Sequence, residues 1–344
     1  MLAKATKEIP VGDYLYEPKW DGFRCIVHRD GDEVVLGSRN EKPLTRYFPE
    51  LIDPIREQLP ERCVVDGELV VPSEDGLDFD LLSQRIHPAD SRVRMLAETT
   101  PAHLVVFDLL ALDDTDLRPL PLQTRRATLE RILDQARPPI HLTPSTDDPR
   151  RATDWFERFD GSGFDGVMAK ALDEPYVSDK RVQLKVKHHR TADCVVAGYR
   201  HHKDGGVGSL LLGLFDDAEP PQLHHVGVAS AFAASRRRTL AAELAPYEDG
   251  GADGHPWHEW AEAEAHGDGV RMPGAPSRWS GGRSSEWVPL RCELVVEVTY
   301  ENLTSGRFRH PARFVRWRPD KEPLDCRYTQ LDHPPPVEFT QIFD

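Results

Sequence analysis

The sequence has few cysteines and no long apolar run. Five cysteines (Cys25, Cys63, Cys194, Cys292 and Cys326) are scattered singly through 344 residues, and no Cys-x-x-Cys pair occurs. An odd, dispersed set argues against a disulfide framework and against a structural zinc site. No stretch of about 18 apolar residues is present to span a membrane, and the opening MLAKATKEIP lacks the apolar core of a signal peptide. We therefore expect a reducing, cytoplasmic compartment and no membrane partner.

Basic charge is also in short supply. There are 43 Lys and Arg residues against 58 Asp and Glu, for a formal net charge of −15. Taken alone, this balance argues against a nucleic-acid partner. The charges are unevenly distributed, however, because residues 239–270 hold eight acidic residues and no Lys or Arg, whereas residues 181–203 and 307–321 are rich in both. An acidic chain can present a basic face, so net charge leaves nucleic-acid binding open.

The chain length and pattern predict two domains. Residues 23–40 alternate apolar and polar residues around Asp30-Gly31, which predicts a β-hairpin turning there. Further strands are expected at 63–71, 103–112 and 164–170, and helices at 44–59, 121–136 and 155–159, the last broken by Gly161 and Gly163. We expect an α+β domain over residues 1–190.

The pattern changes after about residue 190. Short apolar runs at 194–200, 209–215, 224–229, 293–304 and 314–318 are separated by Gly-rich turns, which is typical of a small all-β barrel. A helix is expected at 235–245, and the Gly-, Pro- and acid-rich stretch 247–285 is predicted to be a surface excursion. We expect this second domain over residues 191–330 and a C-terminal tail over 331–344.

The segment YEPKWDGFR, residues 16–24, contains a lysine in an unusual setting. A lone lysine is ordinarily a solvated surface residue. A lysine acts as a nucleophile only when burial or neighbouring cations favour its neutral amine. Pro18 and Trp20 would stiffen and partly dehydrate Lys19, and Asp21-Gly22 would allow Lys19 and Arg24 to face one pocket.

Several other residues suit phosphate chemistry, which needs cations, carboxylates for a metal ion and an aromatic platform for a base. Glu68 lies in an otherwise apolar strand, and core packing alone would also explain Phe107. Ordinary turns or ion pairs would equally explain the carboxylates. The cations are Arg24, Arg39, Lys185 and Lys187, and the carboxylates are Glu68 and Asp165.

Seven short motifs occur in a fixed order: KWDGFR, SRN, DGEL, VVFDLL, DGVMAK, LKVK and RWRPDK. Each is weak alone, but together they resemble the nucleotidyltransferase motifs of ATP-dependent DNA ligases, and the chain looks most similar to the compact bacterial C-type enzymes. The resemblance implies an α+β nucleotidyltransferase domain, ATP-grasp-like, followed by an all-β OB-fold barrel. It also implies sealing of nicks between a 3′-hydroxyl and a 5′-phosphate.

The same resemblance implies roles for single residues. Lys19 would take AMP from ATP, Phe107 would stack on adenine, and Glu17 would lie near the adenine amino group through its main chain. Glu68 would bind the ribose and help Asp165 to hold Mg²⁺ or Mn²⁺. Arg24 and Arg39 would contact ribose or nucleic-acid phosphate. Lys185 and Lys187 would contact the phosphates of ATP and AMP. Asp320 and Lys321 would orient the pyrophosphate.

The chain departs from the family pattern at two positions. Most ligases have Glu where Asp165 stands, and many have Trp where this chain has Gln183. We read both as subfamily variation.

The expected partner is nicked duplex DNA, with repair polymerases as further candidates. A monomer associated with the bacterial nucleoid is expected. The alternatives are an RNA ligase, a GTP-dependent capping-type nucleotidyltransferase and an inactive nucleic-acid-binding scaffold.

Overall fold

The computed structural model describes residues 1–74, 76–159, 164–248, 254–257, 287–304, 306–331 and 337–343. The chain divides into two compact units, Met1–His188 with the C-terminal residues 337–343, and His189–Asp332. The predicted break at Gly161 and Gly163, and most of the predicted excursion over 247–285, lie outside the described residues. None of the described helices is long and apolar enough to cross a membrane.

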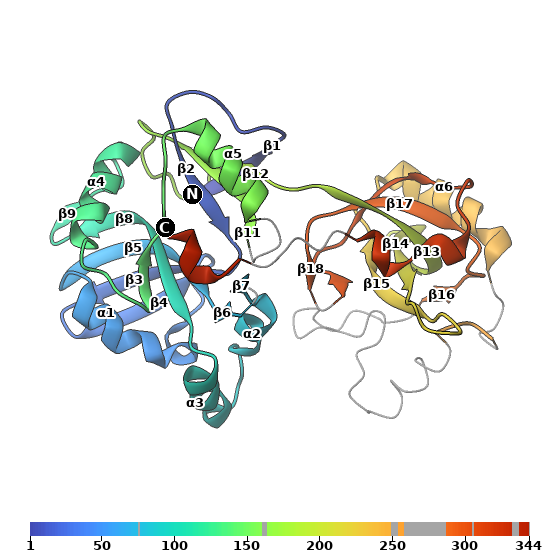
Figure 1. Cartoon of the computed structure of the whole chain (residues 1–344), viewed down its shortest axis with the longest axis horizontal. Coiled ribbons are helices and arrows are strands. Elements are labelled where there is room, and N and C mark those ends of the chain that lie inside the picture. Colours follow the sequence, from blue (N-terminus) through green and yellow to red (C-terminus); the bar gives the residue numbers. More distant parts are fainter. Residues whose placement is uncertain are drawn as a thin grey trace. The chain divides into compact units, whose positions relative to one another are not determined.

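Two sheets form the first unit (Figure 1). The smaller sheet has the order β1 (Leu2–Thr6), β12 (Arg181–Val186), β11 (Phe164–Ala171), β2 (Tyr14–Trp20). The larger sheet runs β10 (Ile140–Leu142), β8 (His103–Leu112), β5 (Arg62–Val70), β3 (Phe23–Asp30), β4 (Glu33–Ser38), and β9 (Thr115–Asp116) pairs with β8. The chain passes from one sheet to the other between Trp20 at the end of β2 and Phe23 at the start of β3.

Strands β3 and β4 form the predicted hairpin, with Asp30 opposite Glu33. The turn residues are Gly31 and Asp32, one position later than expected, because Gly31 adopts a φ of 58° that suits glycine. Cys25 and Val27 are buried, and His28 on the opposite face is exposed. The predicted alternation therefore fixes which face of β3 enters the core.

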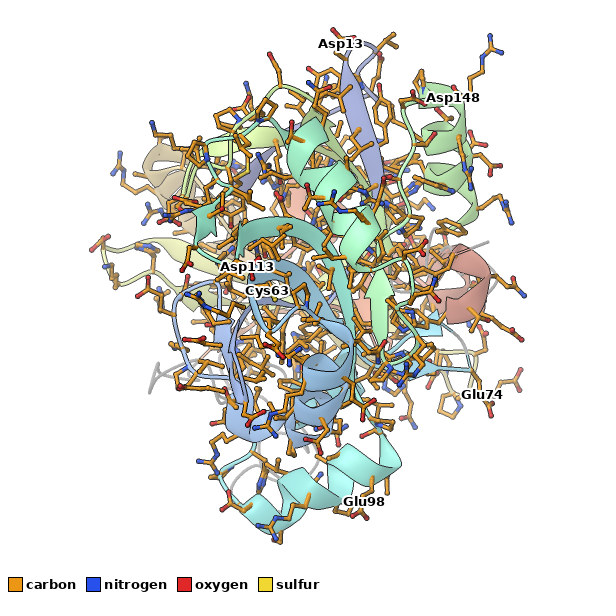
Figure 2. The ribbon with its side chains drawn as sticks, turned by 90° about the vertical axis from the view of Figure 1, so that its left-hand side faces the viewer. Asp13, Cys63, Glu74, Glu98, Asp113 and Asp148 are labelled. Atoms are coloured by element: carbon orange, nitrogen blue, oxygen red, sulfur yellow. The ribbon has the colours of Figure 1, made fainter. Side chains whose placement is uncertain are left out.

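The described residues of the first unit also form α-helices. They are α1 (Ile52–Gln58), α2 (Phe79–Gln84), α3 (Asp90–Thr99), α4 (Leu122–Ile132) and α5 (Pro149–Arg158). The single helix predicted over 44–59 is wrong, since two 3₁₀ turns, Thr45–Tyr47 and Pro49–Leu51, precede α1 and Phe48 leaves helical geometry. Helix α5 lies beside β2 and β11 in Figure 1, and the carboxylate of Asp148 (labelled in Figure 2) caps it by accepting from the Arg150 amide at 2.8 Å. A short hairpin, β6 (Pro72–Ser73) and β7 (Gly76–Leu77), precedes α2.

The second unit is built on one sheet ordered β15 (Leu223–Ala229), β14 (Val207–Phe215), β13 (Arg190–His201), β17 (Val295–Tyr300), β20 (Arg313–Trp317). Strand β16 (Val288–Pro289) also pairs with β13, and β18 (Leu303–Thr304) pairs with β19 (Arg307–Phe308). Helix α6 (Ala234–Leu244) matches the helix expected at 235–245. Further 3₁₀ turns of this unit are Ala245–Tyr247, Pro323–Asp325 and Tyr328–Gln330. The 3₁₀ turn Phe339–Ile342 belongs to the first unit.

The prediction of a surface excursion over 247–285 is wrong at His255 and Trp257, although Glu248, Gly254 and Pro256 are exposed. Trp257 is fully buried in the core of the second unit, and its indole N–H donates to the Leu223 carbonyl at 2.7 Å. His255 is also buried and bonds to the Ala197 carbonyl at 2.9 Å. The average composition of a segment does not reveal one large apolar side chain within it. Burial of a single indole can be enough to hold the segment against the core.

Candidate functional site

Lys19 is the penultimate residue of β2, where the chain leaves the smaller sheet for the larger one. The Asp21-Gly22 step that follows also brings the chain into close contact with β5. A β-carbon on Gly22 would lie 2.1 Å from the Leu69 carbonyl oxygen of β5 and 2.9 Å from the Cγ atom of Glu68. Only glycine permits this approach, and the approach brings Lys19 to the Glu68 strand.

A second glycine, in DGVMAK, assembles the other side of the site. Gly166 has a φ of 109°, and a β-carbon there would lie 1.9 Å from the Val186 carbonyl oxygen. The start of β11 is therefore pressed against the end of β12. This contact places Asp165 beside Lys187, the first residue after β12.

The centre of the site is one carboxylate that accepts from two lysines. The Asp165 Oδ2 atom lies 2.8 Å from the Lys19 Nζ atom and 2.5 Å from the Lys187 Nζ atom. Burial acts to raise the pKa of Asp165, but the two ammonium groups outweigh it and the pKa is lowered. The Lys19 side chain remains 20% exposed, so the group can be reached from solvent.

Phe107 of β8 lies in the site and is only half-buried. The Lys170 ammonium is 4.6 Å from the centre of its ring, and the Arg24 guanidinium carbon is 5.8 Å away. One face of the ring therefore points toward the cations, and the ring is not fully buried in the core. This arrangement suits a platform for a base.

Sequence reasoning missed the network behind this platform. Lys170 is buried and pairs with the Glu17 carboxylate at 2.5 Å, and Arg126 lies 3.5 Å from the other oxygen of Glu17. A lysine inside the apolar run VMAKA is the signal that could have found it, because a buried ammonium requires a partner. The Glu17 side chain is thus committed to ion pairs, which leaves only its main chain for the predicted adenine contact.

Arg24 is held by a residue that was also missed. Its guanidinium donates to both oxygens of Asp66, at 2.9 and 2.5 Å, and Tyr176 donates its hydroxyl to the same carboxylate at 2.9 Å. The fully buried Asp66 is the first residue of DGEL, so that motif orients an arginine as well as supplying Glu68.

Arg24 and Arg39 line the same groove of about 720 Å³ on the larger sheet. Asp113 (labelled in Figure 2) and Asp179 are among the acidic residues that line it as well. Arg39 is exposed, directly after β4. Arg24 also lies opposite Glu68 on the neighbouring strand and close to the Phe107 ring, so it joins this groove to the site around Lys19.

Glu68 is half-buried on β5, opposite Arg24 on β3. Burial is the main cause that raises its pKa to about 7, and the Asp66 carboxylate adds to the increase. Lys19, Arg24 and the Gly22 amide act in the opposite direction without cancelling it. Glu68 can therefore change charge near neutral pH.

Lys185 belongs to the same face of the smaller sheet as Glu17. Both residues stand opposite Met168, Lys185 on β12 and Glu17 on β2. Directly paired residues on neighbouring strands point to one side of a sheet. The structure therefore brings Glu17, Lys19 and Lys185 to one face, with Asp165 and Lys187 at its end.

The last two predicted residues belong to the second unit. Asp320 pairs with Arg318 at 2.8 Å, and the hydrogen bonds from that guanidinium lower its pKa to about 2. Lys321 lies 3.3 Å from the Asp193 carboxylate, which also accepts from Arg318 at 2.8 Å. Arg318 was not singled out, although it stands in the same RWRPDK motif.

The described residues do not form a complete coordination site for a divalent cation. Within the part of the chain that the structure describes, no three His, Cys, Asp or Glu side chains are grouped to hold a metal ion. Mg²⁺ commonly binds through one or two carboxylates and the phosphates of its substrate. Asp165 and Glu68 fit that arrangement.

The chain is similar to known proteins over most of its length. A family model described as "ATP dependent DNA ligase domain" matches residues 1–187, and "ATP dependent DNA ligase C terminal region" matches residues 203–321. DNA ligase C2 of Mycolicibacterium smegmatis is 54% identical over 97% of this chain and 94% of that protein. DNA ligase C of Mycobacterium tuberculosis is 53% identical over 99% of this chain and 96% of that protein. A solved structure described as "DNA binding with a minimal scaffold: Structure-function analysis of Lig E DNA ligases" has a TM-score of 0.55 at 18% identity, covering 92% of this chain and 98% of its own.

Proposed function

The chain belongs to the ATP-dependent DNA ligase family, and on that premise we propose that Lys19 carries AMP from ATP to DNA. The protein is an ATP-dependent DNA ligase, with a nucleotidyltransferase unit followed by an OB-fold unit. What remains to be assigned is the work of its individual residues.

The observation that carries the proposal is the shared carboxylate of Asp165. It fixes the Lys19 amine beside a second cation, Lys187, in a partly dehydrated site. Nucleophilic lysines are activated by burial and by neighbouring cations. The same cations then suit an incoming phosphate, so one set of residues serves both the nucleophile and its substrate.

In the first step the Lys19 nitrogen attacks the α-phosphorus of ATP. Lys19 first gives up the proton that it donates to Asp165, so that its nitrogen has a free electron pair. A nitrogen–phosphorus bond then forms with loss of a second proton to solvent, the bond from the α-phosphorus to the bridging oxygen breaks, and pyrophosphate leaves with that oxygen. Lys185 and Lys187 are proposed to hold phosphate oxygens, and Asp320 and Lys321 to orient the pyrophosphate. Positioning and charge neutralisation are the main catalytic contributions in such transfers.

The nucleoside is proposed to bind to the Phe107 platform. Its adenine stacks on the ring, near the main chain of Glu17, and its ribose hydroxyls donate to Glu68. Asp165 and Glu68 would hold Mg²⁺ or Mn²⁺ together with the nucleotide phosphates. Such an ion supplies charge neutralisation on the phosphates when bound.

The later steps use DNA. An oxygen of the 5′-phosphate at a nick attacks the phosphorus of the lysyl-AMP, and the nitrogen–phosphorus bond breaks. The 3′-hydroxyl then attacks the 5′-phosphorus and AMP leaves. Arg24 and Arg39 are proposed to contact DNA phosphate or ribose, since they line one groove and Arg24 lies opposite Glu68.

We further propose that this ligase acts in DNA repair, as a monomer at the bacterial nucleoid, with repair polymerases as partners. These assignments extend the ligase activity and are tested separately from it.

Incubation with ATP labelled at its α-phosphate tests the role of Lys19. The wild-type protein and a Lys4→Ala control, which changes an exposed lysine of β1, should become labelled in an acid-labile form. Lys19→Ala should not, and neither GTP nor NAD⁺ should replace ATP. Labelling of Lys19→Ala to the wild-type level would refute the assignment, and labelling from GTP would move the protein to capping-type specificity.

A further inference from the structure

Two cations of the second unit converge on a carboxylate outside the motifs. Asp193 of β13 accepts from the Arg318 Nη1 atom through Oδ1 at 2.8 Å and Oδ2 at 3.0 Å. The Lys321 Nζ atom lies 3.3 Å from its Oδ2 atom. Asp193 falls between the two regions matched by the family models, which end at residue 187 and resume at 203.

Asp193 is itself firmly held. Its amide donates to the Gln330 side-chain oxygen at 2.7 Å, and its carbonyl accepts from the Gln330 side-chain nitrogen at 3.0 Å. Its carboxylate is only 12% exposed, and the residue is paired across the sheet with Glu297. The two amide bonds fix the strand at this point, so the carboxylate has a defined position and direction.

The neighbouring acids do not duplicate this arrangement. Asp320 bonds to Arg318 but is 59% exposed and belongs to the same motif as the cations. Glu297 bonds to Arg316 at 2.7 Å and lies 3.7 Å from Arg318. Among the residues that the structure describes, Asp193 alone joins Arg318 to Lys321 through ion pairs.

We propose that Asp193 is a positioning residue for self-adenylylation, which holds Arg318 and Lys321 side by side for the pyrophosphate of ATP. Two cations this close repel each other, and a carboxylate bonded to both offsets that repulsion while fixing their direction. This inference rests on the proposed role of Lys321 at the pyrophosphate. Because pyrophosphate takes part only in the first step, the loss of Asp193 should affect that step and spare the final one.

The test compares Asp193→Asn with wild type in two single-turnover assays. One follows self-adenylylation at saturating ATP, and the other follows sealing of a nicked duplex whose 5′-phosphate already carries AMP. Asp193→Asn should slow the first by about tenfold or more and leave the second within about twofold, and Asp193→Glu should recover most of the lost rate. Asp217→Asn, which removes an exposed acid of the same unit, should alter neither rate.

Sealing of the pre-adenylylated nick also serves as the test of folding. If Asp193→Asn slows both reactions equally, or slows neither, the positioning role is refuted. Lys321→Ala distinguishes a failure of this inference from a failure of the proposed function. If Lys321→Ala slows self-adenylylation and Asp193→Asn does not, only the inference about Asp193 fails, whereas an unaffected Lys321→Ala would overturn the proposed function of Lys321 itself.

Discussion

At the scale of single residues, the motif glycines explain more of the site than the motif charges do. Gly22 and Gly166 each touch the carbonyl oxygen of a neighbouring strand, and these contacts bring Lys19, Asp165 and Lys187 together. The sequence predicted the charged residues because phosphate chemistry requires them. It could not predict Asp66, Lys170 or Arg126 as their supports, since those pairings join distant segments of the chain.

Replacing Gly22 with alanine should be severe. The new β-carbon would lie 2.1 Å from the Leu69 carbonyl oxygen, so β3 and β5 must separate or the Lys19 strand must shift. We expect a loss of about 2 kcal/mol or more in the free energy of unfolding, and little self-adenylylation. Gly37→Ala is the matched control in the same sheet, because its new β-carbon would lie 3.8 Å from the nearest atom, the Ile26 carbonyl oxygen. Urea titration of both variants measures the difference, and equal stability would contradict the proposed close approach.

Glu68 should give the first step a dependence on pH near 7. Its carboxylate, with a pKa raised to about 7 chiefly by burial, must be ionised to accept from ribose hydroxyls or bind a metal ion. The rate of self-adenylylation at low ATP should therefore rise between about pH 6 and about pH 8, and Glu68→Gln should be slower and lack this rise. A rise with the same midpoint in Glu68→Gln would assign the titration to another group.

Ionisation of Glu68 should lower the free energy of unfolding as pH rises, whereas it should raise the rate of self-adenylylation. Because the folded-state pKa is above that of the unfolded chain, folding favours the protonated acid. This contribution is fully present below the unfolded pKa of about 4.5 and is lost as pH rises through about 7. Glu68→Gln should thus gain stability relative to wild type between pH 5 and pH 8, measured by thermal unfolding. A constant difference across that range would contradict the raised pKa.

At the scale of elements, prediction succeeded where local periodicity decides the structure. The β3–β4 hairpin, β5, β8, β11 and α4 all follow their apolar patterns, and α6 lies where a helix was expected. Prediction failed where contacts from distant residues decide it, as with Trp257, which enters a core formed by other strands. Elements with weak local patterns, such as α2 and α3, were not predicted.

The C-terminal 3₁₀ turn Phe339–Ile342 shows the same limitation. A tail was expected, yet Phe339 and Ile342 are buried in the first unit with Trp20 and Phe164. Phe343 stacks on Trp20, with ring centres 5.6 Å apart. Trp20 follows Lys19 directly, and Phe164 precedes Asp165, so the C-terminal aromatics pack against the strands that carry the proposed site.

Truncation of Phe339 should therefore destabilise the first unit. The ring is 5% exposed and packs edge-on against Trp20, His103 and His141. Phe339→Ala should lower the free energy of unfolding by about 3 kcal/mol, whereas Met95→Ala, which truncates a side chain that is 44% exposed, should change it by less than about 0.5 kcal/mol. Chemical denaturation followed by tryptophan fluorescence compares them, and similar small losses would show that the C-terminal turn is not a stable part of the unit.

At the scale of the whole molecule, a net charge of −15 proved a poor guide to function. The described structure divides the chain into two units with separate cores, and the residues predicted to contact phosphate lie in both units. The order of the motifs along the chain predicted the ligase family, which the composition did not. In the mechanism that we propose, one lysine links the two halves of the reaction, by taking AMP from ATP and passing it to DNA.

The most direct test is the fate of that AMP. The wild-type protein is adenylylated with labelled ATP, freed of nucleotide and mixed with a nicked duplex in the presence of Mg²⁺. We predict that the label leaves Lys19 and that each AMP released accompanies one sealed nick, without added ATP. Label that stays on the protein, or sealing that still requires free ATP, would contradict the proposed mechanism.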